Sequence, residues 1–287
     1  MYILLSNADL DCLGHELHLA RFFLFDLLQK NKISINDILV TMKEDRFFLY
    51  DKIFEHIITW DNYCINHKRD ENFVLNLVEY SRGLPIRPPL PEFEKINYHC
   101  DQFKRTPVLE NWIRDISLCN LDEMEEYKKL ANEEFILIHF RSKFVENQND
   151  FNDNYNKVSK IIDKIREKTS KNVIIFSFRQ VHCKNENVYC INDLKTFASF
   201  LNLDNCKLFL SEWSGGGQLS QYCCNGKIIY YFDAYPSLDY EKHYIRAHED
   251  ANSDNVFSWF DFKCVTNCER FYYKTYDQML ENLHTFI

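Results

Sequence analysis

Glycine and proline are scarce in this sequence, which has six residues of each among 287. Three of the glycines form a single run, Gly215 to Gly217, and four of the prolines lie between Gly83 and Pro91. The hydrophobic fraction of 46%, with 24 Phe and 17 Tyr, excludes a disordered chain and supplies a sizeable core. The two clusters therefore stand out in a chain that otherwise has the composition of a globular protein.

Long apolar runs and long basic runs are also missing. No apolar run approaches the roughly 20 residues of a membrane-spanning helix, and the start Met1-Tyr-Ile-Leu-Leu lacks the basic residues and the length of a signal peptide. Because the net charge is -9 and no Lys/Arg block occurs, we expect neither a nucleic-acid partner nor binding to an anionic membrane. The 11 cysteines are scattered and odd in number, which favours reduced thiols and a cytoplasmic protein.

Motifs for bound cofactors are absent as well. The turn after the first predicted strand lacks Gly-x-Gly-x-x-Gly, and no Gly-x-x-x-x-Gly-Lys-Ser/Thr sequence occurs. Neither a dinucleotide cofactor nor a nucleotide triphosphatase loop is therefore expected. Asp9 and Asp11 match an Asp-x-Asp metal pattern, but so short a pattern often arises by chance. We predict no cofactor and no metal.

Strands alternate with helices in the first half. Residues Tyr2 to Ser6, Asp37 to Thr41 and His56 to Trp60 predict buried strands. Apolar residues at spacings of three and four predict a helix that packs on a sheet, namely Leu13, Leu17, Ala20, Leu24 and Leu27. The charged segment Val108 to Leu130 is also helix-like. This alternation is typical of a parallel α/β sheet.

The second half repeats this alternation more regularly. The predicted strands are 135–140, 173–178, 188–191, 208–211 and 227–232, and the predicted helices are 155–168, 194–200, 218–224 and 276–286. We place the boundary near residue 130, which gives domains 1–130 and 131–287. The predicted fold class is α/β, with two halves and a cleft between them.

The glycine run follows an apolar strand-like segment and precedes a helical one. In this setting Ser214 is a natural N-cap, and Gly215 to Gly217 occupy the first turn of the helix. The unpaired N–H groups and the positive dipole end of such a turn attract anions. Each glycine costs a helix roughly 1 kcal/mol relative to alanine. We interpret the run as a place where a phosphate approaches the backbone closely, and a flexible turn is the alternative.

Two arginines directly follow predicted strands of the second half, Arg141 after residues 135–140 and Arg179 after residues 173–178. Ligands bind outside the carboxyl ends of parallel strands, and a guanidinium group matches phosphate oxygens. Either arginine alone also fits a surface charge or a salt bridge. Together with the glycine turn they predict a diphosphate site. Its predicted residues are Arg141, Arg179, Glu212, Ser214, Gly215, Gly216, Gly217 and Gln218.

Four acid or base side chains follow the first predicted strand: Asp9, Asp11, His15 and Glu16. A base that removes a hydroxyl proton works best when its pKa is near the working pH, which favours His15 and allows a partly desolvated carboxylate. We predict that one of these four residues is a general base. Loop and helix-capping roles are the alternative, since acidic residues are common near helix starts.

Two segments of the second half resemble a known family. Ile138-His-Phe-Arg141 is similar to the His-x-Arg motif of GDP-fucose-type fucosyltransferases, and Leu210-Ser-Glu-Trp-Ser-Gly-Gly-Gly217 is similar to the Ser/Gly-rich turn of their donor domain. The resemblance covers residues 135–232, and Ser142 and Lys143 replace the Arg and Asp that usually extend the first motif. The small size and the abundance of Asn, Lys, Ile, Phe and Tyr also resemble glycosyltransferases encoded by large DNA viruses.

This resemblance implies the GT-B fold, in which two Rossmann-like domains face each other across a cleft. It also implies an inverting, metal-independent glycosyltransferase that moves a sugar from a GDP- or UDP-sugar donor to a glycan or other hydroxyl acceptor. Arg141 would contact the donor phosphates, and Ser214 to Gly217 would cradle them. The alternatives are a non-catalytic protein that binds a nucleotide or a sugar phosphate, and a phosphatase or esterase acting through Ser214, whose surroundings lack Gly-x-Ser-x-Gly.

Overall fold

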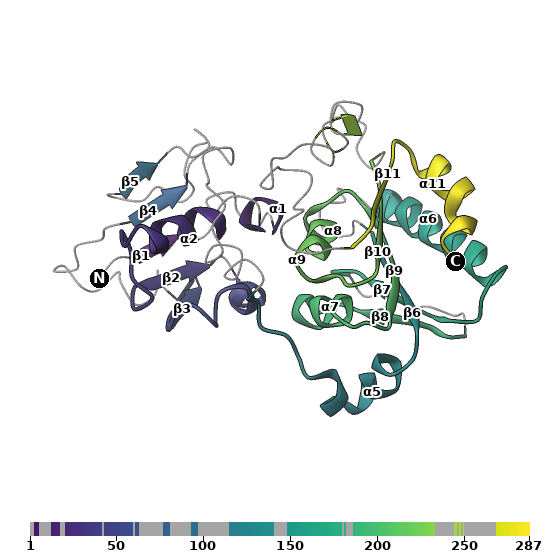
Figure 1. Ribbon diagram of the computed structural model, residues 1–287, viewed down its shortest axis with the longest axis horizontal. Coiled ribbons are helices and arrows are strands. Elements are labelled where there is room, and N and C mark those ends of the chain that lie inside the picture. Colours follow the sequence, from purple (N-terminus) through teal and green to yellow (C-terminus); the bar gives the residue numbers. More distant parts are fainter. Residues whose placement is uncertain are drawn as a thin grey trace. The chain divides into compact units, whose positions relative to one another are not determined.

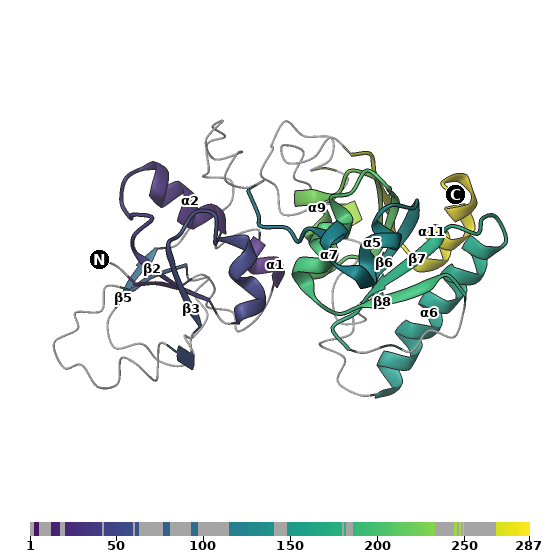
Figure 2. The same ribbon diagram turned by 90° about the horizontal axis from the view of Figure 1, so that it is seen from below.

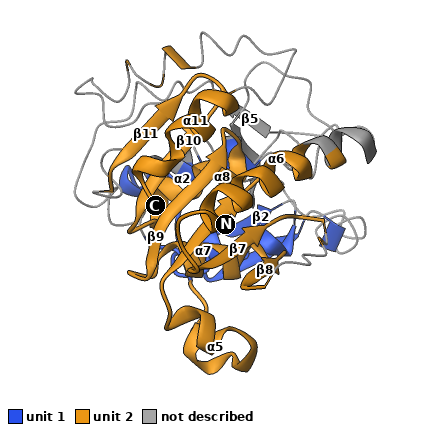
Figure 3. Ribbon diagram, turned by 90° about the vertical axis from the view of Figure 1, so that its right-hand side faces the viewer, with its two compact units in different colours: residues 1–117, 257–259 blue, residues 118–256, 260–287 orange. Residues whose placement is uncertain are grey.

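The computed structural model describes residues 3–5, 13–17, 21–41, 43–59, 61–62, 77–80, 93–96, 115–140, 148–179, 181, 186–232, 244–245, 247, 249 and 268–287. The chain divides into unit 1, residues 1–117 and 257–259, and unit 2, residues 118–256 and 260–287 (Figure 3). The division falls ahead of the predicted boundary at residue 130. Helix α5 (Glu125–Ala131) belongs to unit 2, because Tyr127 packs edge-on against Phe200 and Asn205 Nδ2 donates to Ala131 O at 2.9 Å.

Unit 1 is built on a parallel sheet. Its strands are β1 (Ile3–Leu5), β2 (Ile38–Thr41), β3 (His56–Thr59), β4 (Leu77–Tyr80) and β5 (Phe93–Ile96). They lie in the order β3-β2-β1-β4-β5, and every neighbouring pair is parallel. The three predicted strands are confirmed. The sequence did not predict β4 and β5, whose charged residues Glu79, Glu94 and Lys95 interrupt the apolar pattern.

The helix predicted after β1 is described in two stretches. They are α1 (Leu13–His15) and α2 (Arg21–Gln29), and the 3-10 helix η2 (Glu44–Leu49) follows β2. The predicted apolar stripe is confirmed at its described positions, because Leu13, Leu17, Leu24 and Leu27 are all buried. The pattern therefore identified the buried face, and residues 18–20, between the two stretches, lie outside the described residues.

Unit 2 contains a second parallel sheet. Its strands are β6 (Phe135–His139), β7 (Asn172–Phe176), β8 (Val188–Ile191), β9 (Cys206–Glu212), β10 (Lys227–Tyr231) and β11 (Arg270–Tyr273). They lie in the order β11-β10-β9-β6-β7-β8, and every neighbouring pair is parallel. The α/β class and the five predicted strands are confirmed, whereas β11 was not predicted.

Helices cover both faces of this sheet (Figures 1 and 2). On one face lie α6 (Gln148–Arg166), α11 (Tyr276–Asn282) and the 3-10 helix η5 (Leu283–Thr285), and on the other lie α7 (Leu194–Leu201), α8 (Gly215–Gln218) and α9 (Ser220–Cys223). The short 3-10 helix η4 (Leu121–Glu123) precedes α5. Because both faces are covered, β6 and β7 are buried along their whole length, which explains their continuous apolar runs.

The strand order of unit 2 reverses beside its first strand. The chain runs outward from β6 through β7 to β8, and then continues from β9, on the other side of β6, through β10 to β11. In doubly wound α/β sheets, ligands bind at this switch point, outside the carboxyl ends of the two central strands. The ends of β6 and β9 are therefore the first place to look for a site. None of the helices in the described ranges is long and apolar enough to cross a membrane.

Candidate functional site

A row of side chains crosses the middle of the unit 2 sheet near the carboxyl ends of its strands. Strand register pairs Phe176 of β7 with His139 of β6, His139 with Ser211 of β9, and Ser211 with Tyr230 of β10. These side chains share the face covered by α7, α8 and α9, since Phe176 stacks on Phe197 of α7 with ring centroids 4.1 Å apart. Three consecutive members, His139, Ser211 and Tyr230, are polar and buried.

The segment after β9 forms a capped turn above this row. Ser214 has an extended backbone, and its Oγ accepts a hydrogen bond from Gly217 N–H at 3.2 Å. The carbonyl oxygen of Ser214 accepts from Gln218 N–H at 2.8 Å. The predicted N-cap at Ser214 and the glycines in the first turn of α8 are therefore confirmed.

His139 connects this turn to the central strand β6. Its Nε2 lies 3.0 Å from Ser214 Oγ, and its Nδ1 lies 3.3 Å from the carbonyl oxygen of Phe176. Its ring, only 3% exposed, packs near Phe176 and Phe197, with centroid distances of 5.3 Å and 5.9 Å. Sequence reasoning used His139 only as part of the His-x-Arg motif and gave it no role. The histidine in that motif was the available signal.

The packing of the turn gives a second explanation for two glycines. A Cβ atom on Gly216 would lie 2.5 Å from His139 Nε2, and one on Gly217 would meet Ser211 Oγ and lie 2.8 Å from the carbonyl oxygen of Glu212. Both glycines are buried. They are required because the turn lies directly on β6 and β9, so close approach of a ligand is not needed to explain them.

Tyr230 holds the same turn from β10. Its hydroxyl lies 2.6 Å from Ser220 Oγ, and Gly217 O lies 3.1 Å from the Tyr230 hydroxyl and 2.7 Å from Ser220 Oγ. One of the two hydroxyl groups therefore donates to the other, which donates to the carbonyl oxygen. Burial raises the pKa of the Tyr230 phenol well above its usual range, so the phenol keeps the proton that it donates. The turn is thus fixed from three strands, β6, β9 and β10, which makes its backbone preorganised.

The other predicted donor-binding residues occupy different surroundings. Arg141 lies outside the described residues. Arg179 is half-buried just after β7, and its backbone N–H donates to Ser177 Oγ at 3.2 Å. Glu212 is buried, but its register partner is Tyr231, which packs in the core on the α6 and α11 face. Because side chains alternate along a strand, Glu212 points away from the face that carries His139. Gln218 is buried in α8, whereas Gly215 is half-buried.

The predicted general bases are placed only in part. Asp9 and Asp11 lie outside the described residues, and His15 lies in α1, although its side chain is not among those described. Glu16 is 1% exposed, and its Oε2 lies 3.1 Å from Nε of Arg46, which is also 1% exposed. This buried ion pair favours a structural role for Glu16 rather than the predicted catalytic one.

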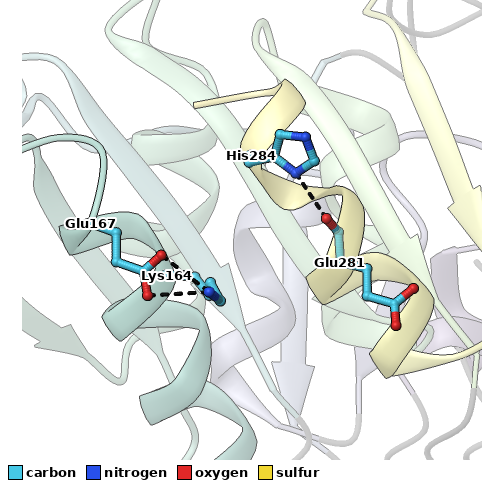
Figure 4. A network of polar contacts seen from close by, with 4 residues as sticks. All are labelled: Lys164, Glu167, Glu281 and His284. Carbon is cyan, nitrogen blue, oxygen red and sulfur yellow. Dashed lines mark hydrogen bonds and ion pairs between the residues drawn. The ribbon is translucent and has the colours of Figure 1, made fainter.

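A groove of about 600 Å³ lies on the opposite face of the unit 2 sheet. It is lined by the end of α6 and by α11 and η5, where Lys164 Nζ pairs with Glu167 and His284 Nδ1 lies 2.8 Å from Glu281 O (Figure 4). The end of α6 leads into the amino end of β7, whereas ligands of such sheets bind at the carboxyl ends. We therefore place the candidate site at the turn and not in this groove.

Within the described ranges, no group of three or more His, Cys, Asp or Glu side chains is placed to hold a metal ion. No protein-family model matches the sequence, and comparisons with curated proteins and with solved structures gave no match. The strand order and the buried contacts of the turn are therefore the observations from which a function can be inferred.

Proposed function

We propose that unit 2 binds the diphosphate of a GDP- or UDP-sugar at the carboxyl ends of β6 and β9, and that the protein is a glycosyltransferase. The observation that carries this proposal is the coincidence of two independent features. The strand order has its switch point between β6 and β9, and the Ser214 to Gln218 turn is fixed to β6 at that point through His139. Switch points are where doubly wound sheets bind nucleotides.

The chemistry of the surrounding residues supports a diphosphate ligand. Arg179 follows β7 and Arg141 follows β6 by two positions, so both come from carboxyl ends next to the switch point. Guanidinium groups form charge-assisted hydrogen bonds with phosphate oxygens. The first N–H groups of a helix lack partners within the helix, and those of Gly215 and Gly216 precede the N–H that Ser214 caps.

In the proposed reaction, the acceptor hydroxyl attacks the anomeric carbon while the bond to the nucleotide diphosphate breaks. The arginines and the turn stabilise the negative charge that grows on the leaving diphosphate. A rigid, preorganised site is effective here because its donors need not reorganise during the reaction. A base from unit 1, His15 or one of the acidic residues Asp9 and Asp11, takes the acceptor proton. Two Rossmann-like domains of the GT-B type, with unit 1 for the glycan acceptor, complete this proposal.

Release of nucleotide diphosphate tests the proposal. Incubation of the full chain with GDP- and UDP-sugars should release GDP or UDP slowly by hydrolysis, and faster when a glycan acceptor is added. We expect a chelator to leave this release unchanged, because arginines neutralise the leaving group. A protein that binds a nucleotide sugar tightly but releases no diphosphate under either condition would be the non-catalytic binder instead.

One contact favours a second candidate, a hydrolase with Ser214 as nucleophile. Ser214 Oγ lies 3.0 Å from His139 Nε2, and the carbonyl oxygen of Phe176 orients the other ring nitrogen, as in serine–histidine sites. Against it, Ser214 is only 8% exposed and Gly216 lies against the His139 ring. A leaving group would have to reach Nε2 at that covered position. Hydrolysis of simple esters or phosphate monoesters that is lost in Ser214→Ala would favour this candidate.

A further inference from the structure

The hydrogen bonds described for His139 and Ser214 indicate how the protons of this pair are arranged. A carbonyl oxygen only accepts, so the contact of His139 Nδ1 with Phe176 O places a proton on Nδ1. In the neutral imidazole, Nε2 is then an acceptor and takes the hydroxyl proton of Ser214 at 3.0 Å. Gly217 N–H donates to a lone pair of Ser214 Oγ. The single proton of the Ser214 hydroxyl is thus directed toward β6.

This arrangement limits what Ser214 can offer an anion. A hydroxyl group has one donor and two acceptor positions, and a phosphate oxygen needs the donor. While His139 is neutral, that donor is engaged by Nε2. If Nε2 gains a proton, it becomes a donor to Ser214 Oγ, and the hydroxyl proton can turn toward the ligand.

We propose that His139 and Ser214 form a proton-coupled pair, in which binding of a nucleotide sugar takes up one proton at His139 Nε2. The proton comes from the solvent; the Ser214 O–H bond only rotates, and no covalent bond forms or breaks. This inference rests on the proposed function, because it requires the diphosphate to bind beside Ser214. It makes His139 a positioning residue, acting on the ligand through Ser214.

The described groups that contact His139 include aromatic rings and backbone. Phe176 of β7 and Phe197 of α7 present aromatic rings, and Gly216 of α8 presents backbone. Ser211 of β9 presents a hydroxyl group that donates to Glu212 O at 2.6 Å. Charged groups at this edge of the sheet include the Glu212 carboxylate, which lies on the other face, and Arg179 after β7. A bound diphosphate would supply negative charge next to Ser214.

Calorimetric titration of the full chain with GDP- and UDP-sugars tests the pair. The diphosphate of a nucleotide sugar is doubly esterified and does not titrate near neutral pH, so proton uptake reports on the protein. Titration in buffers of different ionisation enthalpy should show uptake approaching one proton. Within the pH range of uptake, the affinity should fall up to about tenfold for each unit of increasing pH.

Two variants locate the proton. His139→Gln can donate an N–H to Ser214 Oγ but does not titrate, so we expect it to bind without proton uptake and with a pH-independent affinity. Ser214→Ala removes the coupled hydroxyl and should also lose the uptake, which keeps the test valid if His139→Gln does not fold. Binding by the wild type without uptake, or uptake that persists in Ser214→Ala, would overturn the pair but leave the proposed function standing. Absence of any nucleotide-sugar binding would overturn both.

Discussion

Replacing Glu16 by glutamine is expected to lower the free energy of unfolding of unit 1 by about 3 kcal/mol. Glu16 and Arg46 are both about 1% exposed and their charged atoms lie 3.1 Å apart. The amide keeps the shape and an acceptor oxygen but removes the charge of the buried partner, whereas Asp45, whose Oδ1 lies 3.4 Å from Arg46 Nη1, is one-third exposed. Hydrogen exchange resolved to peptides of unit 1 measures the loss.

An exposed ion pair in the same unit is the matched control. Lys52 and Asp115 approach to 2.9 Å, but both side chains are 46% exposed, so Asp115→Asn should cost less than about 1 kcal/mol. The Glu16 variant also separates two roles for this residue. If Glu16→Gln abolishes turnover while hydrogen exchange in unit 1 stays at the wild-type rate, Glu16 is a general base and the structural interpretation is wrong.

Gly217→Ala and Gly216→Ala are each expected to lower the stability of unit 2 by about 2 kcal/mol, in spite of the better helix propensity of alanine. The new methyl group at Gly217 would overlap Ser211 Oγ and the backbone of β9, which cannot move away without disturbing the sheet. At Gly216 it would overlap the ring of His139, which is a side chain and not backbone. We therefore expect the larger loss at Gly217. Thermal melting should show a decrease of about 4 to 8 °C.

Gly215→Ala is the matched control for these variants, because Gly215 lies in the same helix but is only half-buried. It should change the melting temperature little. The three substitutions also test why glycine is present. Should Gly216→Ala and Gly217→Ala melt like the wild type yet bind nucleotide sugars more weakly, the glycines serve ligand approach, as the sequence alone predicted.

Most of the unit 2 fold could be predicted from the sequence, because parallel strands buried on both faces appear as uninterrupted apolar runs. The runs ending at His139 and Phe176 are of this kind. The three strands that were missed, β4, β5 and β11, lie at or next to a sheet edge, where residues need not be apolar: β11 begins with Arg270, and β5 contains Glu94 and Lys95.

The candidate site was predictable in position but not in its contacts. A glycine run after an apolar segment indicated a turn at the end of a strand, and the N-cap at Ser214 is there. The contacts of His139 with Ser214, of Ser211 with the Gly217 position, and of Tyr230 with Ser220 each join a strand to the turn or to the helix that follows it. Only the strand register brings them together, and one sequence contains no direct record of register. The ion pair of Glu16 was missed for the same reason, because its partner Arg46 comes from another element.

Titration of the wild type and of the Arg141→Ala and Arg179→Ala variants with GDP- and UDP-sugars tests most directly whether unit 2 binds a diphosphate. Each charge-assisted hydrogen bond to phosphate contributes about 1.5 to 3 kcal/mol, so each variant should bind roughly 10- to 100-fold more weakly than the wild type. Lys207→Ala is the control. Lys207 is a cation near the amino end of β9, away from the proposed site, and it pairs with Glu134. We predict that both arginine variants lose affinity and that Lys207→Ala does not. Unchanged affinity in both arginine variants would contradict a diphosphate site at this edge of the sheet.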